Sequence, residues 1–186
     1  MLFCGRIVAE KGVRELIDAV TGISDTRVKL LIIGSDNFAQ GNKGRYAEDI
    51  EKLVAENKDR IMHLGYVDNG MLYQYYKSAD VQVVPSIWEE PAGLVVLEGM
   101  MSRVPLIITR SGGMIEYVNN EYTKIIPKDE YLVENIREHI IALMNNPDEC
   151  QRMADGAYEW AKQFSKQKYY ADFCDIMDEW QNEAKT

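Results

Sequence analysis

The apolar residues of this chain are arranged in two patterns. In short stretches they are almost continuous, as in RVKLLIIGS at residues 27–35 and VQVVP at residues 81–85, which is typical of strands buried on both faces of a parallel sheet. In the segments between them they recur every three or four residues, as Val13, Leu16 and Ile17 do, which is typical of a helix with one buried face. Strands and helices are therefore predicted to alternate along the chain.

This alternation predicts an α/β fold, a Rossmann-like doubly wound parallel sheet with C-terminal helices. The expected strands fall within residues 1–5, 27–34, 60–67, 79–85, 104–109 and 121–127. The expected helices fall within residues 12–23, 45–57, 69–79, 91–101, 131–145, 147–163 and 165–182. No repeat or linker interrupts them, so residues 1–186 are predicted to form one domain. Because the chain opens directly on the apolar run MLFCG, we expect this domain to be part of a longer protein.

Composition and charge argue against several classes of protein. The net charge of −9 and the pI near 4.8 do not suit a surface for nucleic acid or anionic lipid. Cys4, Cys150 and Cys174 have no metal-ligand spacing and fit reduced thiols of an intracellular protein. No apolar run reaches the ~18 residues of a spanning helix, and the N-terminus does not resemble a signal peptide. We therefore expect a soluble, cytoplasmic domain.

Candidate ligand-binding residues follow the predicted strands. In a doubly wound sheet, ligands bind outside the carboxyl ends of the strands, and Arg6, Val67, Glu90 and Gly112 each come just after one. Arg6 and Lys11 would meet a bound diphosphate with two cations and the free N–H groups of a helix start. The spacing alone also fits two solvated surface charges.

The stretch WEEPAGLVVLEGMM, at residues 88–101, is the segment around which we expect the site to be organised. Pro91 suits the first turn of a helix, and Gly93 allows a bound group to approach the backbone closely. The N–H groups of that turn would form an anion site, with Glu90 at its lip. Glu98, up to about two turns further along, could meet a second group on an extended ligand. Taken alone, both glutamates also fit ordinary positions near a helix start.

A later turn carries two adjacent glycines, Gly112 and Gly113. Without Cβ atoms, their backbone could be approached by a phosphate or a sugar. A plain tight turn explains them equally well.

Three patterns together resemble the retaining, family 4 (group 1) glycosyltransferases of the GT-B fold. The first is the E-x7-E arrangement of Glu90 and Glu98, with Pro-x-Gly-Leu directly after the first glutamate. The second is Gly-Arg followed by Lys-Gly within residues 5–12, and the third is Gly-Gly-x-x-Glu at residues 112–116. The resemblance covers essentially the whole chain but only the C-terminal, donor-binding half of such an enzyme.

The resemblance implies a role for each matching residue. Arg6 and Lys11 would hold the donor diphosphate and stabilise the negative charge that grows on it as it leaves. Glu90 would contact hydroxyls of the donor sugar, which makes these three the implied catalytic residues. Glu98 would accept hydrogen bonds from the ribose hydroxyls. The other implied donor-binding residues are Gly5, Tyr66, Val67, Ala92, Gly93, Leu94, Gly112, Gly113 and Glu116.

The chain departs from the family pattern at two places. Ala92 stands where the family often has an aromatic residue, which would leave the sugar pocket roomier. The family commonly has a glycine-rich turn where this chain has Asn119, Asn120 and Glu121, so the rim of the site is expected to differ there.

The implied function is transfer of a sugar, with retention of configuration, from a nucleotide-diphosphate sugar such as a UDP- or GDP-sugar. No metal or other cofactor is expected. The acceptor, a glycan or a lipid-linked molecule, would bind through an N-terminal domain missing from this chain, and any membrane contact would be made there. The isolated domain is accordingly expected to transfer no sugar. Other GT-B activities, such as a sugar-nucleotide epimerase or a glycan phosphorylase, and a non-catalytic nucleotide-binding module remain alternatives.

Other notable residues are expected to be structural. His63, inside an apolar strand, fits a packed or capped side chain. Aromatic residues near the C-terminus fit packing positions, and any that are exposed would fit a missing neighbour; they are Trp160, Phe164, Tyr169, Tyr170, Phe173 and Trp180. The polar segment at residues 35–44 lacks the GK[ST] arrangement of a phosphate loop and is a secondary candidate site.

Overall fold

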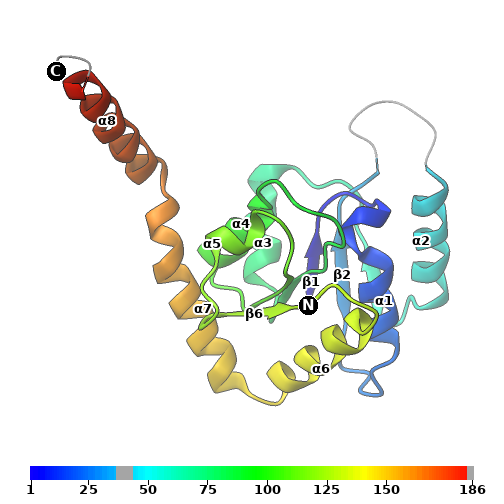
Figure 1. Cartoon of the computed structure of the whole chain (residues 1–186). Helices are drawn as coiled ribbons and strands as arrows, with labels where there is room; N and C mark the ends of the chain where they lie inside the picture. Colours follow the sequence, from blue (N-terminus) through cyan, green and yellow to red (C-terminus); the bar gives the residue numbers. More distant parts are fainter. Residues whose placement is uncertain (37–43, 184–186) are drawn as a thin grey trace.

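The computed structural model describes residues 1–36 and 44–183 of the chain, and within this part it contains one six-stranded parallel sheet (Figure 1). The strands are β1 (Leu2–Cys4), β2 (Leu30–Ile33), β3 (Ile61–His63), β4 (Gln82–Val84), β5 (Leu106–Thr109) and β6 (Thr123–Ile126). Their order in the sheet is β3-β2-β1-β4-β5-β6. The order reverses between β1 and β4, which is the point where a doubly wound sheet opens a crevice at its carboxyl edge.

Helices cover both faces of this sheet. They are α1 (Val13–Thr21), α2 (Arg45–Glu56), α3 (Asn69–Lys77), α4 (Leu94–Met101), α5 (Met114–Tyr117), α6 (Leu132–Met144), α7 (Pro147–Ala161) and α8 (Lys166–Glu183), with short 3-10 turns η1 (Ala9–Lys11) and η2 (Lys162–Phe164). Successive strand residues point to opposite faces: Phe3 packs beneath α1, α2 and α6, whereas Leu2 and Cys4 pack on the other face, beneath α3. The predicted fold class is confirmed.

The element bounds agree closely with those expected from the apolar periods. Helix α4 begins at Leu94, at the far end of the expected range of residues 91–94, so Pro91 lies before its first turn. Gly93 precedes the helix with φ of 67°, a left-handed conformation that a helix cannot continue through. His63 is capped as expected, because its Nε2 lies 2.8 Å from the carbonyl oxygen of Gly34.

The aromatic residues near the C-terminus divide into two groups. The indole N–H of Trp160 donates to the carbonyl oxygen of Tyr117 at 3.0 Å, and the ring of Phe164 meets the ring of Tyr117 edge to face. On α8, however, the side chains of Tyr169, Tyr170, Phe173 and Trp180 are more than half exposed. The expectation that all six aromatics pack is therefore wrong for these four, because α8 extends away from the body of the domain (Figure 1).

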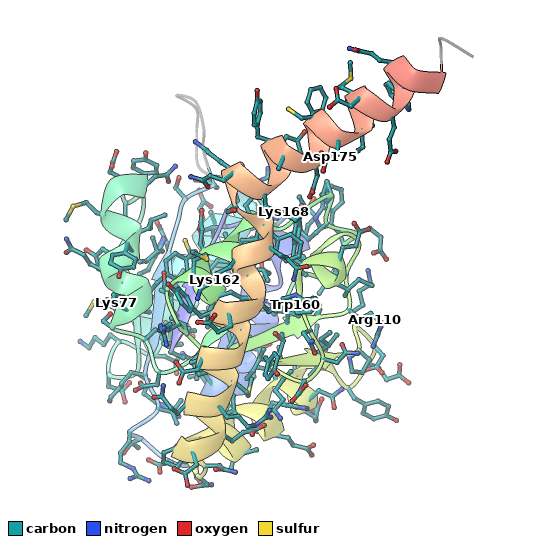
Figure 2. The ribbon with its side chains drawn as sticks, turned by 90° about the vertical axis from the view of Figure 1, so that its left-hand side faces the viewer. Lys77, Arg110, Trp160, Lys162, Lys168 and Asp175 are labelled. Carbon is teal, nitrogen blue, oxygen red and sulfur yellow. The ribbon has the colours of Figure 1, made fainter. Side chains whose placement is uncertain are left out.

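Figure 2 shows the same division from the side: α7, with Trp160 and then Lys162 just past its end, crosses the body, whereas α8, with Lys168 and Asp175, continues beyond it. The secondary candidate site at residues 35–44 lies mostly outside the described residues, which exclude 37–43.

Candidate functional site

The turn that carries Lys11 is fastened to the loop after β4. The carbonyl oxygen of Glu10 accepts a hydrogen bond from the Ser86 hydroxyl at 3.1 Å and one from the backbone N–H of Ile87 at 2.9 Å. Gly12 follows with φ of 67°, and a Cβ atom on it would lie 2.0 Å from the carbonyl oxygen of Pro85. Only glycine allows this close approach, which brings residues from two separate strand–helix units together at the carboxyl edge.

Lys11 and Glu90 form an ion pair at this junction. Lys11 Nζ lies 2.5 Å from Glu90 Oε1, and Ser86 Oγ donates to the same oxygen. Burial opposes ionisation, but the hydrogen bonds from Lys11 and Ser86 outweigh it and hold the pKa of Glu90 below its usual value. The Glu90 side chain is only 5% exposed, whereas that of Lys11 is 21% exposed. Glu90 therefore lies inside the loop and not at the lip, because its carboxylate turns toward the Lys11 ammonium group.

The loop that holds Glu90 is supported from beneath by buried hydroxyl groups at the end of β5 and just after it. Thr109 Oγ1 donates to the carbonyl oxygen of Ser86 at 2.6 Å, and Ser111 Oγ donates to that of Trp88. All three hydroxyl-bearing residues, Ser86, Thr109 and Ser111, are fully buried. These contacts give the carbonyl groups of Ser86 and Trp88 hydrogen-bond partners and join the loop to the end of β5.

Gly112 and Gly113 contact the same loop. A Cβ atom on Gly112 would lie 2.2 Å from the carbonyl oxygen of Glu90, and the N–H of Gly113 donates to that oxygen at 2.7 Å. The N–H of Gly112 donates to Glu89 Oε2 at 2.6 Å, and the other oxygen of Glu89 is paired with Lys128. The two glycines thus hold the Glu90 loop in place, and their N–H groups are already engaged.

The second predicted glutamate lies apart from this ion pair. Glu98 is exposed on the second turn of α4, and its Oε2 accepts a hydrogen bond of 2.7 Å from the hydroxyl of Tyr76 on α3. Gly93, just before α4, packs against Met114, since a Cβ atom there would lie 2.3 Å from the Met114 side chain. Helix α4 is thus held between α3 and α5 at the edge where Lys11 also lies.

The remaining predicted residues occupy the same edge in varied settings. Gly5 follows β1 and donates its N–H to the carbonyl oxygen of Ile33 at 3.0 Å, and Arg6 after it is exposed. Tyr66, after β3, is 72% exposed, whereas Val67 packs against the cluster that contains Tyr76.

Three further predicted residues flank α4 and α5. Ala92 is half-buried before α4, and Leu94 is 62% exposed in its first turn. Glu116 is exposed on the four-residue helix α5. Within the described part of the chain, no side-chain hydrogen bond or ion pair joins Glu116 to Lys11 or Glu90.

Sequence reasoning missed several residues that shape this site, namely Tyr76, Glu89, Thr109, Ser111 and Lys128. The polar residues that end and follow an apolar strand mark Thr109 and Ser111 as positions of interest. Nothing in the pattern pairs Glu89 with Lys128, which are 39 residues apart.

A cavity of about 440 Å³ lies at the opposite, amino edge of the sheet, bordered by residues such as Val81, Pro105 and Ile140. It contains none of the predicted site residues. Within residues 1–36 and 44–183, no cluster of three or more His, Cys, Asp or Glu residues is arranged to hold a metal ion. A search of the same described residues finds no helix with both the length and the apolar character needed to cross a membrane.

Residues 1–160 match the family model for glycosyl transferases group 1. The chain therefore belongs to this family, and the resemblance to a C-terminal domain of the GT-B glycosyltransferases is confirmed.

Curated relatives agree with this assignment. The chain is 36% identical over 126 residues to an uncharacterized glycosyltransferase, MJ1607, of Methanocaldococcus jannaschii, a match that covers 67% of this chain and 30% of the relative. It is 28% identical over 160 residues to the alpha-D-kanosaminyltransferase of Streptomyces kanamyceticus, covering 84% of this chain and 39% of the relative. The chain thus spans less than half the length of these relatives.

Solved structures share the fold. Anabaena Alr3699/HepE in complex with UDP matches with a TM-score of 0.84 at 19% identity, over 96% of this chain and 48% of that one. The sucrose-phosphate synthase of Thermosynechococcus elongatus matches with a TM-score of 0.80 at 26% identity, over 98% of this chain and 45% of that one.

Proposed function

We propose that this chain is the donor-binding half of a retaining glycosyltransferase and binds a nucleotide-diphosphate sugar at the carboxyl edge of its sheet. The observation that carries the proposal is the Lys11–Glu90 contact. Two residues 79 positions apart, each expected from its own motif to face the donor, lie 2.5 Å from each other. Family membership makes sugar transfer the reaction in which such a site would act.

Lys11 and the exposed Arg6 would bind the diphosphate. An ammonium group has more N–H donors than its contact with Glu90 uses, and the Lys11 side chain is partly open to solvent. Negative charge grows on the diphosphate as the glycosidic bond breaks, so cations fixed beside it stabilise the transition state more than the ground state. In this proposal the protein supplies that charge without a metal ion.

The two glutamates would divide the rest of the donor between them. Glu98 presents an exposed carboxylate on α4 that would accept hydrogen bonds from the ribose hydroxyls. Glu90, beside Lys11, would contact hydroxyls of the donor sugar next to the diphosphate. The backbone at residues 66–67, after β3, would border the base.

The acceptor would be bound by a further domain of a longer protein. Both the MJ1607 glycosyltransferase and the kanosaminyltransferase are more than twice as long as the region that matches this chain. The exposed aromatic residues of α8 also suit a surface that another part of the protein covers. A glycan or a lipid-linked acceptor would then be delivered across the cleft. The solved structure of HepE with UDP supports a uridine nucleotide as the first donor to test.

The proposal is tested by titrating the domain with UDP, GDP and ADP and with the matching nucleosides, using calorimetry or NMR. Arg6→Ala and Lys11→Ala should each weaken diphosphate binding about tenfold or more, since a hydrogen bond to a charged group contributes about 1.5–3 kcal/mol. Nucleoside binding should change little. Lys162→Ala is the control, because Lys162 pairs with Glu159 of α7 and is not among the predicted site residues.

Binding of at least one diphosphate that depends on Arg6 and Lys11 but not on Lys162 supports the proposal. Binding of none of the three would favour a non-catalytic module that has kept the sheet. Equal losses for diphosphates and nucleosides would return Arg6 and Lys11 to the role of ordinary surface cations.

A further inference from the structure

Tyr76 is a buried residue that none of the motifs above includes. It lies on α3 with 2% of its surface exposed, packed with Leu2, Cys4, Ile33 and Val104. Its hydroxyl donates to Glu98 Oε2 at 2.7 Å, across the contact between α3 and α4. A fully buried side chain on one element thus holds an exposed carboxylate on another.

We propose that Tyr76 is a positioning residue for Glu98, which it fixes in the orientation that receives the ribose of the donor. The inference rests on the proposed function, because it assigns Glu98 to the ribose. Tyr76 itself would touch no part of the ligand. Its hydroxyl occupies one acceptor site on Oε2 and leaves Oε1 and the rest of Oε2 to accept from ribose hydroxyls.

The physical reason is the cost of leaving the Tyr76 hydroxyl without a partner. The Cys4 thiol beside the hydroxyl is only a weak acceptor, and the other side chains of the cluster around it are apolar. A buried donor left poorly satisfied is destabilising. Burial also raises the pKa of Tyr76, so the hydroxyl keeps its proton and remains a donor. The rotamer of Glu98 that meets this hydroxyl is therefore favoured before any ligand arrives.

This arrangement matters for binding because glutamate is flexible. An exposed glutamate samples many rotamers and loses that freedom when it binds a ligand. With Glu98 already held, less freedom is lost on binding. The neighbouring residue Val67, which packs on the same cluster, belongs to the loop that would border the base, so the cluster supports two parts of the nucleoside site.

The test uses Tyr76→Phe, which removes the hydroxyl and keeps the ring. Affinities for UDP and for 2′,3′-dideoxy-UDP are measured on the 1–186 chain by NMR titration. UDP binding should weaken about threefold to tenfold, as expected when an ordered side chain is released, while dideoxy-UDP binding stays the same. Tyr75→Phe is the matched control, since Tyr75 is the adjacent tyrosine of α3 but borders a cavity at the amino edge of the sheet.

The double variant Tyr76→Phe/Glu98→Gln separates positioning from general damage. If Tyr76 acts through Glu98, the double variant binds UDP no more weakly than Glu98→Gln alone. Equal losses for UDP and dideoxy-UDP, or additive losses in the double variant, would show a merely structural role and overturn the inference. Thermal melting of each variant confirms that the comparison is between folded proteins.

The two levels of the proposal fail in different ways. If Glu98→Gln weakens UDP but Tyr76→Phe does not, the positioning role is wrong and the proposed function stands. If UDP does not bind the unaltered chain, the same comparison is made with GDP and with ADP, each against its 2′,3′-dideoxy form. Binding of none of them overturns the proposed function and this inference with it.

Discussion

At the scale of single residues, the pairing of Lys11 with Glu90 sets how much positive charge a phosphate would meet. The carboxylate lies 2.5 Å from the ammonium group and is almost fully buried, so water screens the pair less than an exposed pair. A diphosphate would have to share Lys11 with Glu90. The ion pair thus lowers the charge available to an anionic ligand while it holds both side chains in place.

Neutralising Glu90 should strengthen diphosphate binding. Glu90→Gln can still accept from Ser86 but no longer offsets the charge of Lys11, so UDP affinity should rise about threefold to tenfold at low salt. Calorimetry at two salt concentrations measures this. Glu149→Gln is the control, because Glu149 also pairs with a lysine, Lys124, but is not part of the predicted site. If Glu90→Gln instead lowers the affinity for UDP while Glu149→Gln does not, Glu90 supports diphosphate binding and does not compete with the diphosphate for Lys11.

The ion pair also predicts an acid-sensitive contribution to stability. Because the pKa of Glu90 in the fold lies below its usual value of 4.5, the ionised carboxylate stabilises the fold above that pH. The stabilisation is lost as the pH falls below 4.5 and through the folded pKa. Urea unfolding of the wild type and of Glu90→Gln, compared from about pH 7 to about pH 3, should show the difference in free energy of unfolding shrinking toward the acid end. A constant difference across this range would contradict the assignment.

At the scale of elements, the site depends on three loops that touch through two glycines. Gly12 lets the end of η1 lie against Pro85, and Gly112 lets the turn after β5 lie against Glu90. Both adopt left-handed backbone conformations. The contacts hold the loops of three strand–helix units in one arrangement at the carboxyl edge.

Gly12→Ala should both destabilise the fold and weaken diphosphate binding. A left-handed conformation costs an alanine about 1–2 kcal/mol, and its Cβ would also press on the carbonyl oxygen of Pro85. Gly65→Ala is the control, because Gly65 has a similar φ of 71° with nothing within 4 Å of the added Cβ. Chemical denaturation should show a larger loss for Gly12→Ala, and only that variant should lose affinity for UDP. Equal losses of stability would mean that the Pro85 contact is readily relieved.

Most of the fold could be predicted from the sequence because the apolar periods are local signals. The run RVKLLIIGS becomes β2, and the helical spacing of Val13, Leu16 and Ile17 becomes α1. The motifs likewise placed Lys11, Glu90 and Glu98 at one edge of the sheet. Their roles toward a ligand stay predictions.

The contacts among these residues could not be predicted, because they depend on tertiary packing. The burial of Glu90 follows from Lys11, 79 residues away, and the hold on Glu98 comes from Tyr76, 22 residues away. Gly112 fits a ligand-binding turn and a packing turn equally well in sequence. Only the fold shows that a Cβ atom there would meet the backbone of Glu90.

At the scale of the whole molecule, the described residues form a six-stranded sheet with its own core, whereas helix α8 lies outside that core. The exposed apolar side chains of α8 recur with a helical period at Tyr169, Phe173, Ile176 and Trp180. Helix α8 itself extends beyond the body of the domain (Figure 2). Folding of the body should therefore not depend on them.

Phe173→Asp should leave the free energy of unfolding within about 0.5 kcal/mol of the wild type, as for other exposed positions. Trp160→Ala is the contrast, because the indole of Trp160 donates a hydrogen bond to the carbonyl oxygen of Tyr117 and packs against the core cluster that contains Val96. Trp160→Ala should lower the free energy of unfolding by on the order of 2 kcal/mol. Denaturant melts of both variants measure this, and strong destabilisation by Phe173→Asp would show that α8 packs on the domain in solution.

The most direct test of the whole account is an NMR titration of the isotope-labelled chain with UDP-, GDP- and ADP-sugars. At least one of them should bind, and it should bind weakly because, in the proposed function, a further domain supplies the opposite wall of the cleft. Its shifts should gather in the segments at residues 5–12, 66–67, 89–98 and 112–113, and they should be lost in Lys11→Ala. Absence of binding by all three donors, or shifts confined to the amino edge around the cavity beside Val81 and Ile140, would contradict it.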